Sequence, residues 1–490
     1  MRSRVLGFWG SGVLRFWGSG VLAAALTVVV VGARQAPNRS KPPATGPAPV
    51  LKVPPIQKRA LANGLPVWIV EMHEVPVVDV TLLVRSGATS DPPASFGLAS
   101  VTADILDEGA GSRDALQLAD AIDFLGASLS TGSGFDSSTV RLHTLLSKLD
   151  QALPLMADVA LRPTFPQKEM DRVRTSRITS IVQSRDSPST VASLAFPRVL
   201  WGLSHRYGTS SGGTETSLKE MTVADLRAFH AKFYQPANAH LLIVGDISAD
   251  AAVAKLNRAF GAWKNSAPAP KPTLPLASQH GPRQVYLVDK PGAAQSQIRV
   301  GWIGVPRSTP DYFPLTVLNT ILGGSFSSRL NQNLREQHGY AYGASSGFDM
   351  RLEAGPFTAS SGVQTDKTAE SLKEFFKELD GMHQPIPADE LTQAKNLEAL
   401  GFPSGFETTT GMAGRLGDLV IYRLPETFFN EYVPKIQAVT AADVKRVADQ
   451  YLQTNRFAVI VVGDLSKIEK PIRDANIGPV QIVSIDDVIK

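Results

Sequence analysis

A group of hydroxyl and carboxylate side chains at helical spacing lies in the segment 97–109. Ser100, Asp104 and Asp107 recur at intervals of four and three residues, and Glu108 follows directly. On a helix this spacing places the first three on one face. Such carboxylates could bind a divalent cation, but neighbouring carboxylates on one short helix are usually a solvated face. We expect the solvated face, because no imidazole lies beside them.

Side chains that commonly complete a catalytic metal site are scarce. Cysteine is absent, which excludes disulfides, thiolate zinc sites and cysteine nucleophiles. Histidine occurs eight times, at positions 73, 143, 205, 230, 240, 280, 338 and 383, with no pair four residues apart. Two ligands on one helix face need about that spacing. Zinc-dependent hydrolysis catalysed by this chain alone is therefore not expected.

A guanidinium and a phenol form the second group of interest. Apolar spacing predicts a helix that ends at Gly339, which places Arg335 in its last turn. Tyr340 and Tyr342 then alternate onto one face of a predicted strand. Two interpretations stay open here: these side chains face solvent, or Arg335 caps its helix and Tyr342 packs in a core.

The sequence pattern of the elements that position these groups occurs twice in the chain. Thr222 and Asp225 predict a capped helix, followed by an apolar strand and a Gly-Asp turn. Thr440 and Asp443 open the same pattern 218 positions later, without a gap. Each half also begins with strands, at 67–70 and 77–84 in the first and at 284–288 and 297–302 in the second. The fold class is therefore α+β, with two homologous halves, each a mainly antiparallel sheet with packed helices.

Composition shifts divide the chain into five segments. We assign 1–33 to a signal peptide, 34–55 to a Pro-rich tether, 56–265 to the first half, 266–283 to a Pro-rich linker and 284–490 to the second half. With 43% hydrophobic residues, the chain can build sizeable cores. Its net charge of only +4 gives no support for nucleic-acid binding.

The N-terminal segment predicts export. Arg2 and Arg4 precede an uncharged stretch at 16–33, which ends in small residues suited to cleavage. We expect a periplasmic protein, with a secreted or membrane-anchored one as alternatives. The chain would contact a membrane only if this leader stays uncleaved, because its apolar stretch is nearly long enough to span a bilayer.

Several motifs resemble the insulinase/pitrilysin family of metallopeptidases over about 56–470. They lie at 63–65 and 96–99 in the first half, and at 289–292, 295–298 and 322–342 in the second. The resemblance implies two halves that form a clamshell around an extended peptide. It also implies an inverted zinc motif, His-x-x-Glu-His, on a helix of the first half.

This zinc motif is degenerate here. Ser100 and Asp104 stand at the positions of the two histidines, and Ala103 stands at that of the glutamate. The third ligand should fall near Thr179–Ile181, where no carboxylate occurs. We expect no metal and no cofactor in this chain; zinc is expected in a partner subunit.

The second half retains the family's other contribution. Arg335 and Tyr342 match an arginine and a tyrosine that reach toward the scissile peptide in family members. The resemblance thus implies a non-zinc subunit of an exported peptidase, which completes the peptide-cleaving site of a zinc-bearing homologous subunit in trans. An extended peptide substrate would add as a strand near 127–132.

Two other interpretations stay open. The chain could be a non-proteolytic clamshell scaffold that binds peptides or proteins. It could also be an independent hydrolase with an unrecognised site.

Overall fold

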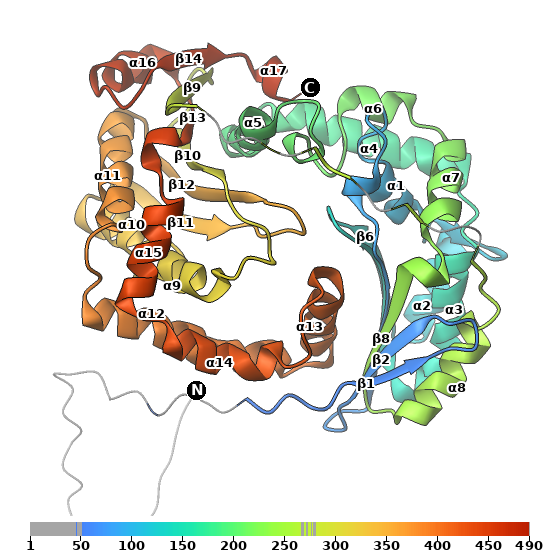
Figure 1. The fold of residues 1–490 in the computed structure, drawn as a ribbon. Coiled ribbons are helices and arrows are strands. Elements are labelled where there is room, and N and C mark those ends of the chain that lie inside the picture. Colours follow the sequence, from blue (N-terminus) through green and yellow to red (C-terminus); the bar gives the residue numbers. More distant parts are fainter. Residues whose placement is uncertain are drawn as a thin grey trace, which may run out of the picture. The chain divides into compact units, whose positions relative to one another are not determined.

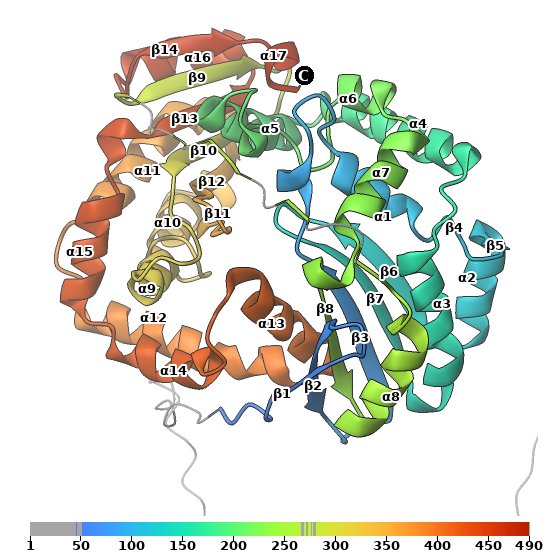
Figure 2. The ribbon, with the colours of Figure 1, turned by 45° about the vertical axis from the view of Figure 1, so that its right-hand side comes forward.

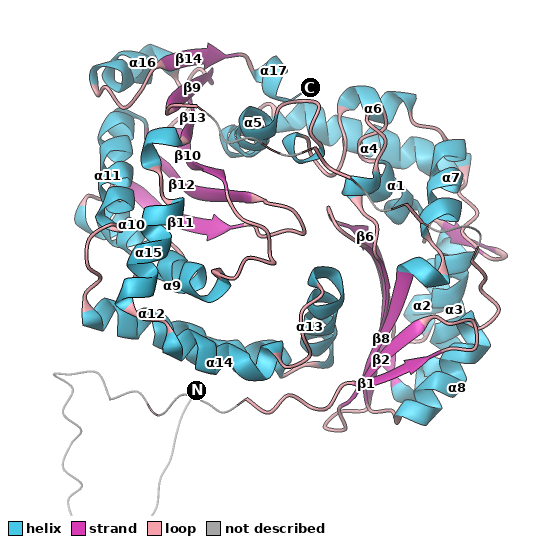
Figure 3. Cartoon of the chain, viewed as in Figure 1, coloured by secondary structure: helices cyan, strands magenta, loops and turns pink. Residues whose placement is uncertain are grey.

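A computed structural model describes the chain except for parts of its N-terminus and its linker. The described residues are 46, 51–265, 269–270, 273–275, 277 and 281–489. The predicted signal peptide and most of the tether lie outside them, as does much of the linker. Within the described part, no helix is long and apolar enough to cross a membrane. Figure 3 shows the mixture of helices and strands that confirms the α+β class.

The first half is built on a six-stranded sheet (Figure 1). Its order is β1-β2-β8-β3-β7-β6, and all neighbours are antiparallel except the parallel pair β2 and β8. Its strands are β1 (Gln57–Ala60), β2 (Pro66–Glu71), β3 (Val77–Val84), β6 (Ser128–Ser133), β7 (Ser138–Leu145) and β8 (Ala239–Gly245). A separate short pair is formed by β4 (Gly109–Ala110) and β5 (Arg113–Asp114). Its helices are α1 (Leu98–Ile105), α2 (Ala115–Phe124), α3 (Leu149–Leu161), α4 (Gln167–Ser184), α5 (Pro188–Trp201), α6 (Glu215–Glu220), α7 (Val223–Phe233) and α8 (Ala249–Phe260).

The second half repeats this plan. Its sheet has the order β11-β12-β10-β13-β9-β14, and only the pairs β13–β9 and β9–β14 are parallel. Its strands are β9 (Gln284–Asp289), β10 (Gln295–Ile303), β11 (Ala341–Phe348), β12 (Pro356–Gln364), β13 (Ala458–Gly463) and β14 (Val480–Val483). Its helices are α9 (Tyr312–Leu322), α10 (Arg329–Asn331), α11 (Thr368–Gly381), α12 (Ala388–Gly401), α13 (Thr409–Tyr422), α14 (Phe428–Ala438), α15 (Ala441–Tyr451), α16 (Leu465–Asp474) and α17 (Ile485–Ile489).

Local signals in the sequence account for several of these elements. The turn between β1 and β2 is closed by Asn63, whose side-chain oxygen accepts a hydrogen bond from the backbone of Leu65, and Gly64 adopts φ +81° there. Thr222 and Thr440 each form the predicted capping box, at the first turns of α7 and α15. The four strands predicted at the starts of the halves are confirmed as β2, β3, β9 and β10.

One helix of each half packs against the sheet of the other half. Helix α5 packs on β10 and β13, and α13 packs on β3 and β8 (Figures 1 and 2). Phe196 of α5 is buried in one cluster with Ile460 of β13, and Leu416 of α13 is buried with Leu83 of β3. The exchange joins the two sheets into one compact unit, which spans Ala48–Lys490. The exact domain boundaries stay predictions.

Candidate functional site

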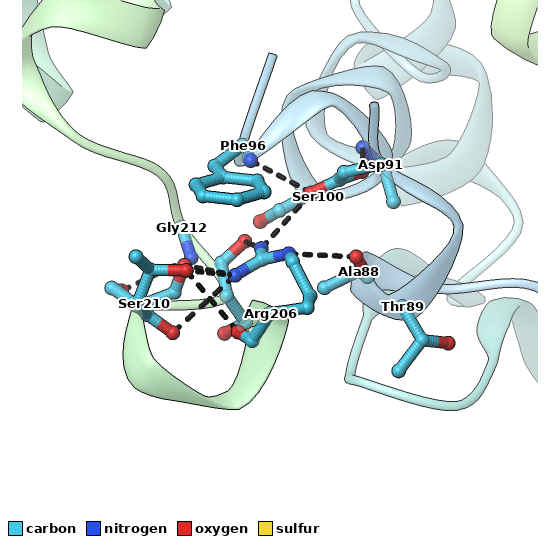
Figure 4. A network of polar contacts seen from close by, with 12 residues as sticks. Ala88, Thr89, Asp91, Phe96, Ser100, Arg206, Ser210 and Gly212 are labelled. Carbon is cyan, nitrogen blue, oxygen red and sulfur yellow. Dashed lines mark hydrogen bonds and ion pairs between the residues drawn. The ribbon is translucent and has the colours of Figure 1, made fainter. Parts of the chain in front are cut away.

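The helix that carries the degenerate motif, α1, is fixed at its N-terminus by a buried carboxylate. Asp91 accepts hydrogen bonds of 2.8 Å from the backbone N–H groups of Gly97 and Ala99. It also pairs with the Arg206 guanidinium at 2.9 Å, and both side chains are at most 3% exposed. Arg206 donates further hydrogen bonds to the carbonyl oxygens of Ala88, Thr209, Ser210 and Ser211 (Figure 4). This network ties the start of α1 to the loop that follows α5.

The two faces of α1 differ in the way that the sequence predicts. Val101 and Ile105 are fully buried, while Ser100 and Asp104 are half-buried on the other side. Ala103, at the position of the catalytic glutamate, is completely buried. The helix ends at Ile105, so Asp107 lies beyond it rather than on its face. The three polar groups therefore do not form one helical face.

A guanidinium occupies the space between the degenerate positions. Arg177 of α4 approaches Asp104 Oδ2 with Nη2 at 2.5 Å and Nε at 3.1 Å. The same Nη2 donates to Ser100 Oγ at 2.9 Å, and Nη1 donates to the carbonyl of Gly212 at 3.1 Å. With a side chain only 19% exposed, Arg177 is held by both positions that resemble metal ligands.

These residues do not fit a zinc ion. A serine hydroxyl and one carboxylate replace the two imidazoles, and Ala103 offers no base. The carboxylate of Asp104 is already bound to a fixed positive charge, which would repel a second cation. In the described ranges, no group of three His, Cys, Asp or Glu side chains is arranged to hold a metal.

The contact made by Arg177 was not predicted from the sequence, in which the third ligand was expected near Thr179–Ile181. Ile181 is partly buried among apolar side chains, and Arg177, one turn earlier, is the residue of α4 that meets Asp104. The only signal in the sequence was a positive charge, Arg177, on the later helix that was expected to face Asp104. This charge does not predict the contact unless it is known how the two helices pack against each other.

A shallow pocket of about 420 Å³ opens beside this ion pair. Its polar lining comes from the end of α1, from β6 and from α4, and includes Asp104, Asp107, Glu108, Arg172 and Arg177. Glu108 is paired with Arg172, which also binds Glu169. Burial, together with the charges of Glu108 and Asp104, raises the pKa of Asp107 to about 6. The pocket thus holds alternating charges, mostly neutralised within the protein.

The free edge of the first sheet borders the same pocket. Among the described strands, β6 pairs with β7 alone and is the last strand of its sheet, as predicted for the segment near 127–132. Leu129, Ser130 and Thr131 of this strand line the pocket. An edge strand presents unpaired backbone groups, which can accept an added strand.

In the second half, Arg335 lies in a π-helical turn, Gln332–Gln337, that continues α10. The turn precedes Gly339, which adopts φ +64°, as expected for a residue that ends a helix. The guanidinium lies 4.5 Å from the ring centre of the exposed Phe326 and 3.4 Å from Glu336. Arg335 is thus half-exposed, and in the described part of the chain no carbonyl oxygen of its helix accepts a hydrogen bond from its guanidinium.

Tyr342 is 89% exposed on β11, the edge strand of the second sheet. The expectation that Tyr340 shares its face is wrong. Tyr340 precedes the strand, is half-buried and stacks on His338 with ring centres 4.8 Å apart. The strand has a register shift between Ala341 and Ala344, which breaks the simple alternation.

Comparison with known proteins covers both of these regions. The model named "Insulinase (Peptidase family M16)" matches residues 67–201, and the "Peptidase M16 inactive domain" model matches residues 220–398. The chain belongs to the insulinase family. The first match contains α1 and Arg177, and the second contains Arg335 and Tyr342.

Relatives in this family carry contrasting names. An "uncharacterized zinc protease" of Streptomyces coelicolor is 24% identical over 416 residues, covering 84% of this chain and 90% of that protein. The "non-peptidase homolog YmxG" of Helicobacter pylori is 22% identical over 411 residues, covering 82% and 93%. Whether this insulinase-family chain is active must therefore be inferred from its own residues.

Solved structures of the family share the fold. The peptidase M16 inactive domain from Pseudomonas fluorescens has a TM-score of 0.78 and 28% identity, covering 84% of this chain and 98% of that one. A protease from Helicobacter pylori has a TM-score of 0.77 and 22% identity, covering 84% and 100%. The likeness confirms the α+β fold with two similar halves.

Proposed function

We propose that this chain is the non-zinc subunit of an insulinase-type metallopeptidase and completes the peptide-cleaving site of a zinc-bearing homologous subunit. The observation that carries the proposal is the bond between Arg177 and the two degenerate ligand positions, Ser100 and Asp104. A chain built in this way has an internal cation where a peptidase needs a metal. Its contribution to proteolysis would then come from its other half.

Arg335 and Tyr342 supply that contribution. A guanidinium and a phenol can both donate hydrogen bonds to a peptide carbonyl oxygen that becomes negative during attack. Tyr342 is 89% exposed and the Arg335 side chain 38% exposed, so both are accessible to a substrate. Among the residues that the structure describes, none forms a hydrogen bond with the Tyr342 hydroxyl, which leaves it free to donate.

The substrate in this proposal is an extended peptide. β6 offers it an open sheet edge, and the adjoining pocket provides charged groups for its side chains. Backbone pairing requires little sequence identity, so a broad range of peptides is expected. The N-terminal leader supports a site of action outside the cytoplasm, most simply the periplasm.

The deciding experiment is purification from the native source, followed by identification of a zinc-bearing homologue that purifies with the chain. Reconstituted peptidase activity is then compared for the wild type, Arg335→Ala and Tyr342→Phe. Each variant should lower kcat, with a loss of roughly 100- to 1,000-fold for an essential donor. Tyr340→Phe and Arg473→Ala serve as matched controls, because Tyr340 is half-buried against His338 and Arg473 pairs with Glu469 elsewhere.

Full activity with both Arg335→Ala and Tyr342→Phe would rule out completion in trans. In that event the alternative is a non-proteolytic scaffold that binds peptides or proteins. The open β6 edge favours this alternative, since strand addition needs no catalytic group. Peptide binding by the isolated chain, without any increase in a partner's activity, would support it.

A further inference from the structure

A second and larger cavity lies entirely within the second half. It has a volume of about 560 Å³ and is bordered by α9, α12, α13, α14 and the segment after β11. Helix α12 packs against both α9 and α14, so the walls are formed by stable contacts between helices. Its aromatic lining includes Tyr312, Phe348, Phe402, Tyr422, Phe428 and Tyr432. A cavity of this size and character is typical of sites for small organic ligands.

Arg307 is the unusual residue of this cavity. Its half-buried guanidinium lies 3.6 Å from the ring centre of Tyr312, 4.8 Å from that of Phe428 and 5.9 Å from that of Tyr422. Ring faces stabilise the positive charge but do not accept the in-plane hydrogen bonds of its N–H groups. Within the described part of the chain, no carboxylate or carbonyl accepts a hydrogen bond from this guanidinium.

The acidic groups of the cavity are occupied by other donors. Glu398 accepts hydrogen bonds from Thr320 Oγ1 at 2.6 Å and from the Tyr432 hydroxyl at 3.0 Å. Asp349 is bound by Arg351 at 2.5 Å. Asp349 is thus paired with a cation, whereas Glu398 is hydrogen-bonded by two uncharged hydroxyl groups.

The remaining pair in the cavity is looser. Arg415 lies 3.8 Å from Asp418, without a hydrogen bond between them in the described residues. Arg307 is therefore a cation of the cavity that has no counter-ion within bonding distance among the described residues. Its partner must be water or an anionic ligand, because burying N–H donors without acceptors is unfavourable.

We propose that this cavity binds a carboxylate carried on an aromatic or similarly flat apolar group. The guanidinium of Arg307 would pair with the carboxylate through its planar N–H groups, a geometry that arginine provides and lysine does not. The aromatic walls would hold the apolar part. A free aromatic acid and the C-terminal residue of a peptide share this chemistry.

The inference does not depend on the proposed peptidase role. All of the lining residues belong to the second half, and none of them is Arg335, Tyr342 or a residue of the degenerate motif. The site could therefore be occupied whether or not the chain completes a partner's active site.

Titration calorimetry on the full chain tests the ligand chemistry. The probe is 3-phenylpropionate, compared with its uncharged amide and with phenethylamine, which carries the opposite charge. The acid should bind, and the amide and amine should bind at least roughly tenfold more weakly. An acetylated dipeptide ending in Phe, with a free or an amidated C-terminus, distinguishes a peptide end from a small acid. Equal binding of acid and amide, preference for the amine, or binding of no probe would overturn the proposal.

Substitutions then test the residue assignment. Arg307→Gln should weaken binding of the acid at least roughly tenfold, and Arg307→Lys should restore only part of it. Asp418→Asn should tighten binding, since it removes a nearby competing charge. The matched control is Arg283→Gln, which removes a half-buried guanidinium that lies 4.0 Å from the Phe376 ring centre, outside the cavity. Unchanged affinity in Arg307→Gln would refute the assignment.

A further variant avoids the buried charge altogether. Leu397 lines the cavity and is 50% exposed, so Leu397→Trp adds bulk near its opening with little effect on the core. It should abolish binding while the thermal unfolding temperature stays close to that of the wild type. Retained binding in this folded variant would place the ligand elsewhere.

Discussion

Arg177 brings a permanent positive charge to the side chains that resemble metal ligands. Its planar N–H groups reach Ser100 and Asp104 together. Asp104 is thereby neutralised without an ion from solution. The arginine on α4 thus compensates the charge of the carboxylate on α1, at the positions where the family's zinc ligands are absent.

This interpretation predicts the result of restoring the motif. The variant Ser100→His, Ala103→Glu, Asp104→His should bind zinc poorly while Arg177 remains, because the guanidinium repels the ion. Adding Arg177→Glu should raise zinc affinity by at least roughly tenfold. Zinc content after dialysis, measured by atomic emission, checks both proteins. Equal and stoichiometric zinc in the two would show that Arg177 does not oppose the metal.

Asp107 gives a second prediction at the residue scale. Burial raises its pKa from 3.8 to about 6, so the folded state binds a proton more tightly than the unfolded state. Its ionisation therefore lowers the stability of the fold as the pH rises from about 4 to about 6. Asp107→Asn should raise the free energy of unfolding at pH 8 by about 1–2 kcal/mol, which is less than the full shift implies because the pocket is open to solvent.

Denaturant unfolding at several pH values checks the behaviour of Asp107. The difference between Asp107→Asn and the wild type should shrink toward zero near pH 4. Glu108→Gln serves as a control, since Glu108 is ion-paired with Arg172. A constant difference between pH 4 and pH 8 would contradict the assignment.

At the scale of elements, the Asp91–Arg206 pair determines where α1 begins. Both side chains are almost completely buried, and burial raises the pKa of Asp91 while Arg206 opposes that effect. Arg206→Met would leave a buried carboxylate without its counter-ion. It would also remove the hydrogen bonds that Arg206 donates to four carbonyl oxygens. We expect a loss of about 3–5 kcal/mol in the free energy of unfolding at neutral pH.

Chemical denaturation of Arg206→Met should be compared with that of Arg172→Met. The Arg172 side chain is 54% exposed and pairs on the surface, so its removal should cost about 1 kcal/mol or less. The deficit of Arg206→Met should also diminish at acid pH, where Asp91 becomes neutral. Similar losses in the two variants would mean that the buried pair has no special role.

Signals that act within a few residues were sufficient to predict much of the fold. The Asn63-Gly64 turn, the capping boxes at Thr222 and Thr440 and the repeat of 218 positions all depend on neighbours in the chain or on self-similarity. The degenerate positions Ser100 and Asp104 could be found in the same way. The end of α1 at Ile105 was missed, because the apolar and acidic pattern continues past it.

Contacts between distant segments could not be predicted from the sequence. Arg177 lies 73 positions after Asp104, and their meeting depends on the packing of α1 against α4. The position of Tyr342 relative to Tyr340 depends on a strand irregularity that has no clear local signature. The stacking of Arg307 on three aromatic rings likewise needs the arrangement of α9, α13 and α14.

At the scale of the whole molecule, the exchange of α5 and α13 brings residues of both halves together in two buried clusters, while a third cluster lies within the first half alone. One buried cluster contains Leu83 and Leu242 of the first sheet together with Met412 and Leu416 of α13. Another contains Phe196 of α5 and strands of the second sheet. We therefore expect the two halves to unfold in one cooperative transition, because each sheet is packed against a helix of the other half as well as against helices of its own.

Two glycines of α13 allow this coupling to be tested in one helix. Gly417 is buried against the first sheet, and a Cβ atom built there would lie 3.6 Å from Leu83 Cδ1 and 4.0 Å from Leu242 Cδ1. Gly414, three residues earlier, is exposed and has no such neighbour within 4 Å. Gly417→Leu should force the helix away from the sheet and lower the free energy of unfolding by about 1–3 kcal/mol.

Gly414→Leu adds the same side chain to the same helix on its open face. It should leave stability unchanged or raise it by up to about 1 kcal/mol, because leucine favours the helix over glycine. Thermal unfolding should show one transition for the wild type and for Gly414→Leu. In Gly417→Leu the transition should shift downward and broaden or split, since the first half loses part of its cover. A single, unshifted transition in Gly417→Leu would mean that α13 is not what couples the halves.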